Sequence, residues 1–206
     1  MKMQMAGRYI TLTAETEAEQ DGLGAIAEQM RGRRLQVGSI DRNCVTLRPG
    51  GSGGEDRIKP VNITFDTTPM PLRLISNLAE TPFELNGQRY ASIEGFWQGL
   101  KFPGDADRQR LAALSGHAAK SAGPAAAPGD RIIYQEEVVY VGTADHWALM
   151  ERACNAKFDQ HEPARTALLS TSDQPLAHKV SPDSRTIPGL IMADIWTRIR
   201  ARLATT

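Results

Sequence analysis

Residues 76–102 read SNLAETPFELNGQRYASIEGFWQGLKF, and this stretch decides how the rest of the chain is interpreted. The Asn86-Gly87 pair stands between two apolar-flanked runs, which is typical of a β-hairpin turn. Ser92 then precedes a run with helical periodicity and is a good N-cap, whereas Pro103-Gly104 ends such a run. The stretch therefore predicts an extended segment, a hairpin and a helix that begins near Ser92 and ends before Pro103.

Two rows of side chains run along this predicted helix. The apolar row recurs at i, i+3, i+4 and i+7 and consists of Ile93, Phe96, Trp97 and Leu100. The polar row consists of Glu94, Gln98 and Lys101 and lies about 100° around the helix from it. A polar row beside a buried face can line the rim of a pocket, but the same spacing describes an ordinary solvent-exposed face. Glu94 stands in the first turn, where the helix dipole favours an ionised carboxylate.

Several short motifs follow one another along the chain. They are Ser76-Asn77-Leu78, Pro82-Phe83, Gly87 with Tyr90, Ser92 with Glu94, Gln98 with Lys101-Phe102, then Trp147, Ala156-Lys157-Phe158 and Asp183. In order and spacing they resemble the NADAR family of YbiA-like N-glycosidases, over roughly residues 72–203. Several motifs in series are far more specific than any one of them.

The resemblance and the apolar patterns together predict the fold class. We expect an α+β, mainly helical single domain packed around a small sheet, NADAR-like, over residues 56–206. Helices are predicted at 105–122, 146–160 and 189–203, with a β-strand or hairpin at 131–141 and a strand at 176–180 that contains His178. Residues 1–55 form an N-terminal β-α-β-like extension in this prediction, with strands at 8–13 and 43–49 and a helix at 14–31. The extension is also a candidate docking element for a protein partner.

Composition excludes several classes of protein. The 24 basic residues balance 24 acidic ones, so no bulk charge indicates a nucleic-acid or membrane partner. The two cysteines, Cys44 and Cys154, are far apart and lie outside any Cys/His cluster, which predicts neither a disulfide nor a metal site. We expect no cofactor. No apolar run has the length of a signal peptide or membrane span, so a cytoplasmic location is expected.

The resemblance implies cleavage of an N-glycosidic bond, which passes through an oxocarbenium-like sugar and needs a carboxylate near the anomeric carbon. Glu94 fits that need. Asp183 aligns with the acidic residue of the family's C-terminal motif and is the candidate for protonating the departing base, although a turn Asp often caps its own backbone. Lys101 either binds a phosphate or forms an imine with C1 of an opened ribose. The candidate catalytic residues are thus Glu94, Lys101 and Asp183.

Five further residues are candidate ligand contacts: Arg73, Ser76, Asn77, Trp97 and Gln98. Arg73 offers a planar charged fork for a phosphate or diphosphate, or it is a surface residue of a strand edge. Gln98 would bind sugar hydroxyls. Asn77 belongs to the first family motif, where the amide is expected to bind the ribose-bearing ligand, or it closes its own turn.

The C-terminal motif departs from the family pattern. His178 stands in the place of an acidic strand residue, and Asp183 is followed by SRTIPG without the expected Trp-Gly pair. A tryptophan that would stack on the base is therefore absent there, unless Trp97 or Trp196 substitutes. The predicted substrates are ribosylaminopyrimidine phosphates of the riboflavin pathway or ADP-ribosylated guanine. The alternatives are a catalytically degenerate protein that binds ADP-ribose or NAD-related ligands as a sensor or adaptor, and a partner-docking protein with a vestigial enzymatic body.

Overall fold

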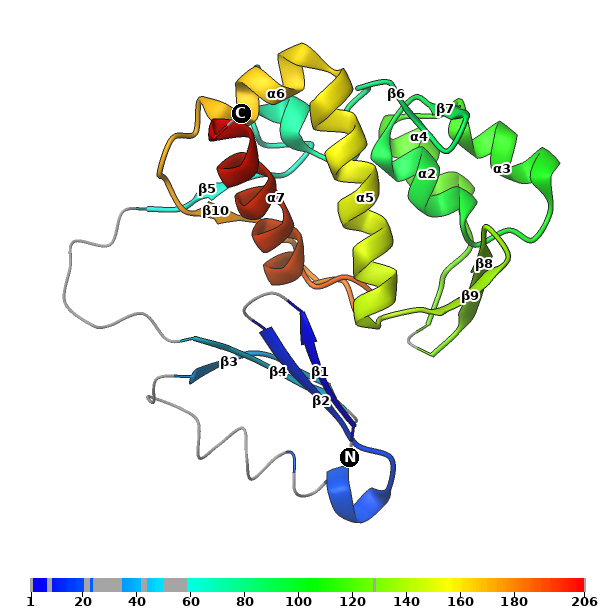
Figure 1. Cartoon of the computed structure of the whole chain (residues 1–206), viewed down its shortest axis with the longest axis vertical. Coiled ribbons are helices and arrows are strands. Elements are labelled where there is room, and N and C mark those ends of the chain that lie inside the picture. The colour runs from blue at the N-terminus through cyan, green and yellow to red at the C-terminus, as the bar shows by residue number, and fades with distance from the viewer. Residues whose placement is uncertain are drawn as a thin grey trace. The chain divides into compact units, whose positions relative to one another are not determined.

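The computed structural model describes residues 2–6, 9–20, 23, 35–41, 44–49, 59–127 and 129–205. The chain divides into two compact units, Met1–Arg57 and Ile58–Thr206, and Figure 1 shows their elements. The predicted boundary between residues 55 and 56 falls outside the described residues.

The first unit contains a four-stranded antiparallel sheet with the strand order β1-β2-β4-β3. Its strands are β1 (Lys2–Ala6), β2 (Tyr9–Thr13), β3 (Leu35–Asp41) and β4 (Cys44–Pro49). Strands β2 and β4 were predicted, whereas β1 and β3 were not, and β2 pairs antiparallel with β4 where a β-α-β unit would be parallel. Most of the helix predicted over 14–31 lies outside the described residues; residues 17–20 are helical.

Over its described residues, the second unit is mainly helical with three two-stranded sheets, which confirms the predicted α+β class. Its elements are β5 (Val61–Asn62), the 3₁₀ helix η1 (Leu72–Ile75), β6 (Phe83–Leu85), β7 (Gln88–Tyr90), α2 (Ile93–Gly99), α3 (Asp105–Ala112), α4 (Gly116–Ala122), β8 (Arg131–Tyr134), β9 (Glu137–Tyr140), α5 (Ala144–Gln160), α6 (Glu162–Leu169), β10 (Leu176–Ala177) and α7 (Gly189–Ala204). Helix α5 packs against both α2 and α7, and the three are visible together in Figure 1.

The hairpin and helix of the central stretch form as predicted. Asn86 and Gly87 have φ angles of 53° and 76°, the left-handed pair that a tight β6–β7 hairpin requires. Ser92 caps α2, because its Oγ accepts the Gly95 N–H at 2.9 Å and donates to the Leu114 carbonyl at 2.8 Å. Every residue of α2 is buried, so the polar row does not lie on an open surface.

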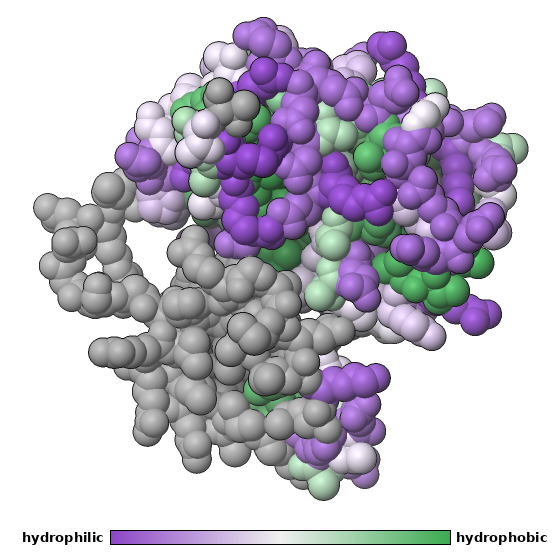
Figure 2. Space-filling view, viewed as in Figure 1, coloured by the Kyte–Doolittle hydropathy of each residue, from purple (hydrophilic) through white to green (hydrophobic). Residues whose placement is uncertain are grey.

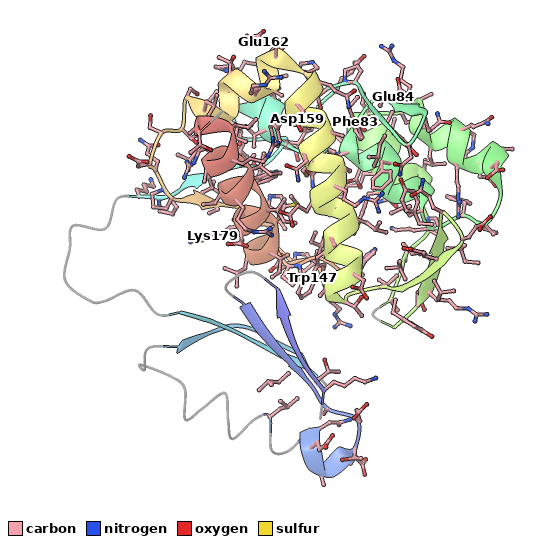
Figure 3. The ribbon with its side chains drawn as sticks, in the orientation of Figure 1. Phe83, Glu84, Trp147, Asp159, Glu162 and Lys179 are labelled. Atoms are coloured by element: carbon pink, nitrogen blue, oxygen red, sulfur yellow. The ribbon has the colours of Figure 1, made fainter. Side chains whose placement is uncertain are left out.

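Helix α5 supplies the central part of the core. Its residues Trp147, Met150, Cys154 and Phe158 lie at helical spacing and are all buried. The N-cap is Thr143, which accepts the His146 N–H, so the helix begins two residues before the predicted start at 146. Figure 3 marks Trp147 near the beginning of α5 and Asp159 near its end.

Two predicted elements differ from the structure because long-range hydrogen bonds replace local ones. The helix expected at 105–122 is divided into α3 and α4: the Leu114 carbonyl accepts from Ser92, and the Gly116 N–H donates to the Leu78 carbonyl at 2.7 Å. The strand expected at 176–180 keeps only two residues. His178 lies outside it, and its Nδ1 bonds the Ile63 carbonyl at 2.7 Å.

Part of the second unit's surface is apolar. Ile133, Val138 and Tyr140 of the β8–β9 hairpin are more than half exposed, and Figure 2 shows green over this hairpin. Among the described residues, no helix combines the length and apolar character needed to cross a membrane.

Candidate functional site

The polar row of α2 forms a continuous hydrogen-bonded chain. Gln98 Nε2 donates to Glu94 Oε1 at 2.7 Å, and Lys101 Nζ donates to Gln98 Oε1 at 2.6 Å. Glu94 and Gln98 are 8% and 7% exposed, and Lys101 is half-buried. A carboxylate and an amine are thus held in fixed positions with an amide between them.

The segment after α4 covers the Lys101 end of this row. Lys101 Nζ donates a second hydrogen bond, 2.9 Å long, to the Pro124 carbonyl. Gly123 packs so closely that a Cβ there would lie 1.9 Å from Gln98 Oε1. This enclosure lowers the pKa of Lys101 through burial, while the charge of Glu94 acts in the opposite direction.

His146 is a member of the site that the sequence did not reveal. It is 4% exposed, and its ring stacks on Trp97 with a centroid distance of 4.2 Å. Its Nδ1 accepts the Gly142 N–H at 3.2 Å. Burial lowers the pKa of His146 to about 4; a hydrogen bond with the Thr186 backbone opposes the shift, and Lys101 adds to it. His146 is therefore a neutral aromatic neighbour of the row at physiological pH.

The tryptophans have little surface left for a base. Trp97 is 6% exposed and one face of its ring is covered by His146, and Trp196 is fully buried beside His178. The ligand contact expected of Trp97 stays a prediction. It requires His146 to move so that the covered face of the Trp97 ring becomes accessible. No sequence signal marks His146, because its partner Trp97 is distant in the chain.

The Ser76-Asn77 motif reaches the beginning of α2 through its backbone. The Asn77 carbonyl accepts the Glu94 N–H at 2.9 Å, so this motif is joined directly to the candidate catalytic residue. The Asn77 amide lies against sulfur atoms, with Nδ2 at 3.1 Å from Met192 Sδ and 3.7 Å from Met150 Sδ. Ser76 is 2% exposed. Their predicted ligand contacts stay predictions.

Lys157 binds the backbone of the same Ser76-Asn77 motif. The sequence marked it only as part of the Ala156-Lys157-Phe158 motif. It is fully buried, and its Nζ donates to the carbonyls of Ile75 and Ser76 at 3.1 and 2.9 Å. Burial lowers its pKa to about 7, with the neighbouring Cys154 opposing the shift. Lys157 therefore anchors the backbone that leads to Asn77 and to the first turn of α2.

The free energy of unfolding of the wild type is expected to rise with pH because of Lys157, and the Lys157→Met variant is expected to lack this rise. Between pH 7 and the ordinary lysine pKa of 10.5, the unfolded chain binds a proton at Lys157 that the folded chain lacks, so the free energy of unfolding rises with pH. Below pH 7 Lys157 is protonated in both the folded and the unfolded chain, so its contribution to the free energy of unfolding no longer changes with pH. Urea unfolding should be compared from pH 7 to 9, because the raised pKa of Cys154, about 12, acts oppositely above pH 9.

The exposed Lys120 of α4 provides the matched control, since Lys120→Met should keep the wild-type slope. An equal slope in Lys157→Met and wild type would contradict the assignment.

Asp183 and Arg73 form their hydrogen bonds with nearby residues outside the row of Glu94, Gln98 and Lys101. Asp183 is exposed, and its Oδ1 accepts the N–H groups of Ser184 at 2.8 Å and Gly189 at 2.9 Å, so it caps the loop that leads into α7. Arg73 Nε donates to the Thr68 carbonyl at 2.9 Å, and its guanidinium lies over Phe65. The structure thus unites Glu94, Gln98 and Lys101, joins Asn77 to them by backbone, and gives Asp183 and Arg73 local partners. The catalytic role of Asp183 and the phosphate contact of Arg73 stay predictions.

The loop after Asp183 nevertheless reaches the site. The Thr186 carbonyl accepts from Trp147 Nε1 at 2.9 Å and also bonds His146, which stacks on Trp97. Within the part of the chain that the structure describes, no group of three or more His, Cys, Asp or Glu side chains could hold a metal ion.

Comparison with known proteins supports the predicted resemblance. The solution NMR structure of the Escherichia coli protein YbiA matches with a TM-score of 0.53 and 21% identity, covering 73% of this chain and 88% of YbiA, so the fold is YbiA-like. An uncharacterised 17.1 kDa protein of the Gp30-rIII intergenic region of Enterobacteria phage T4 is 31% identical over 116 residues, which are 54% of this chain and 75% of the phage protein. Residues 70–199 match the family described as bacteriophage protein GP30.3. The chain therefore belongs to the bacteriophage GP30.3 family, and its second unit has the YbiA-like fold expected from the NADAR motifs.

Proposed function

We propose that the Ile58–Thr206 unit hydrolyses N-glycosidic bonds in ribosylated nucleobase-type substrates. The observation that carries the proposal is the buried carboxylate–amide–amine row of Glu94, Gln98 and Lys101 on α2. The YbiA-like fold supports it, since the row lies on the helix where the NADAR motifs predict the catalytic Glu.

Glu94 would stabilise the positive charge that develops on the sugar as the bond to the base breaks, or activate the attacking water. Its hydrogen bond with Gln98 fixes the carboxylate, so little reorganisation is needed during the reaction. Gln98 would also bind sugar hydroxyls once a substrate is present.

Two roles suit Lys101. As an ammonium it has three donors, of which Gln98 and Pro124 accept two, leaving one for a substrate phosphate. As a neutral amine, favoured by the lowered pKa, it would attack C1 of the opened ribose, and the base would leave with a proton. Water would then hydrolyse the imine and free the amine.

Asp183 is the proposed donor of the proton to the departing base. In the resting protein its Oδ1 accepts two backbone N–H groups, so this role requires the loop before α7 to rearrange when substrate binds. If the loop keeps its resting conformation, another acid or water must protonate the base.

The proposal is tested by incubating the full chain separately with a ribosylaminopyrimidine phosphate and with ADP-ribosylated guanosine. Mass spectrometry should detect the freed base together with ribose 5-phosphate or ADP-ribose from one of the two. A sample without protein measures spontaneous hydrolysis. Absence of any released base above that level, from both substrates, would refute the N-glycosidase.

The alternative is a protein that binds ADP-ribose or NAD-related ligands without turnover. It is favoured by the capped state of Asp183 and by the covered ring of Trp97, which leave the acid and the stacking partner engaged elsewhere. It predicts that ADP-ribose raises the thermal unfolding midpoint while no base is released from either substrate.

A further inference from the structure

A cavity of about 300 Å³ lies beside the β7–α2 junction, bounded by residues of β7, α2, α3 and β8. This volume is at the lower end of the range for small-molecule sites. Its floor includes Phe96, which follows Glu94 by two residues and so lies about 200° around the helix from it. The cavity therefore opens on a different face of α2 from the polar row.

Three aromatic rings form the apolar part of the cavity. Phe96 meets Tyr90 and Tyr134 edge to face, with centroid distances of 5.2 and 5.8 Å. Tyr90 is also stacked on Phe83 at 5.4 Å, and the Tyr134 hydroxyl accepts from Asn86 Nδ2 at 2.6 Å. Phe96 is 1% and Tyr134 is 8% exposed, so only Tyr90 of the three offers partly accessible ring surface. Its contacts with Phe83 and Phe96 fix this ring before any ligand arrives, which suits a flat aromatic ligand.

Arg108 provides a fixed cation at the cavity wall. Its Nε donates to the Phe102 carbonyl and its NH2 group to the Ile133 carbonyl, both at 2.7 Å. Among the described residues no carboxylate forms an ion pair with it, so its charge is available to an acceptor in the cavity. An anchored guanidinium with free N–H groups favours a planar ligand with acceptor atoms on its edge.

The other polar side chains that line the cavity add hydrogen-bond acceptors and groups that can both donate and accept. Asp105 brings a carboxylate, and Gln88 and Gln109 bring amides. Burial, and then Tyr134, raise the pKa of Tyr90 to about 12, so its hydroxyl is a neutral donor and acceptor. A ligand with both N–H donors and carbonyl acceptors on its edge would match this set, whereas a simple anion would meet Asp105 unfavourably.

We propose that this cavity binds a nucleobase-type heterocycle, with the Tyr90 ring beside its plane and Arg108 and Asp105 contacting its edge. Guanine fits best, because O6 and N7 accept from an arginine fork and its N–H groups donate to a carboxylate. Adenine offers an amino donor where guanine has the O6 acceptor, and therefore binds more weakly to this pair.

A neighbouring cavity gives room for the sugar. It has a volume of about 370 Å³ and shares Gln88 and Gln109 with the first cavity, so a nucleoside seated by its base can extend into it. Arg89 lies in its lining.

The test is isothermal titration of the full chain with guanosine and with adenosine. We expect one guanosine site per chain and weaker binding of adenosine. Arg108→Gln should weaken guanosine binding by about tenfold, since one bidentate base contact is lost. Arg110→Gln is the matched control, because Arg110 lies on the same helix, is exposed and pairs with Asp107 at 3.3 Å. It should bind guanosine like the wild type.

Arg108 also holds two backbone carbonyls, so Asp105→Asn serves as a second variant, at an exposed position. It should reduce the preference for guanosine over adenosine while the unfolding midpoint stays at the wild-type value. No guanosine binding, or unchanged affinity and preference in both cavity variants, would overturn the proposal. None of these outcomes depends on N-glycosidase activity.

Discussion

Glu94→Gln is expected to lower the rate of base release by about a thousandfold, the range for loss of one charged catalytic group. The substitution keeps the shape of the side chain and an oxygen that accepts the Gln98 amide, which lies 2.7 Å from Glu94 Oε1. It removes the negative charge that would face the oxocarbenium-like sugar. The loss should therefore appear in kcat and kcat/KM together, with little change in the affinity for ADP-ribose.

The control for this result is Glu137→Gln, an exposed position on β9 outside the proposed site. It should release base at the wild-type rate, and both variants should unfold within a few degrees of the wild type. Full activity of Glu94→Gln would mean that the carboxylate takes no part in the reaction. Equal loss of activity in Glu137→Gln would point instead to a general effect on the protein.

Gly95→Ala is expected to reduce the free energy of unfolding by about 3 kcal/mol, because overpacking a rigid backbone contact is costly. A Cβ at this position would lie 2.6 Å from the Leu111 carbonyl oxygen and 2.7 Å from that of Leu114. Both atoms belong to backbone, and the Leu114 carbonyl already accepts the Ser92 hydroxyl. Relief would need α2 to move away from α3, which would displace the N-cap of α2 as well.

Gly99→Ala is the matched comparison on the same helix. Its added Cβ would meet its nearest atoms at 3.7 Å, an ordinary contact, and the helix propensity of Ala adds up to about 1 kcal/mol. Urea unfolding should therefore show a lower free energy of unfolding than the wild type for Gly95→Ala and an equal or higher one for Gly99→Ala. The two variants should differ by several kcal/mol. Similar stability for both would show that the α2–α3 contact is softer than the structure indicates.

The sequence predicted well those elements whose signals are local. Helix α2 follows from the Ser92 cap and the apolar row, the β6–β7 turn from Asn86-Gly87, and α7 from the apolar pattern over 189–203. The polar row was also predicted from helical spacing alone. Spacing left open whether that row faced solvent, and the answer came from segments distant in the chain, namely the covering by Gly123 and Pro124.

The features that were missed depend on contacts between distant residues. The division of α3 from α4 is fixed by Ser92 and Leu78, and the short β10 by a partner strand of only two residues. His146 gains its role from Trp97, and Lys157 from the carbonyls of Ile75 and Ser76. In each case local propensity and pattern gave no information about the partner.

The close approach of Gly123 to Gln98 limits how this arrangement could be moved to another protein. The carboxylate, amide and amine come from one short helix, but the amine is positioned by the Pro124 carbonyl and the amide by a residue that has room for nothing larger than hydrogen. An engineer who grafted α2 alone would transfer the three side chains without the backbone that orients them. A working transplant would have to carry the turn after α4 as well, with glycine kept at its first position.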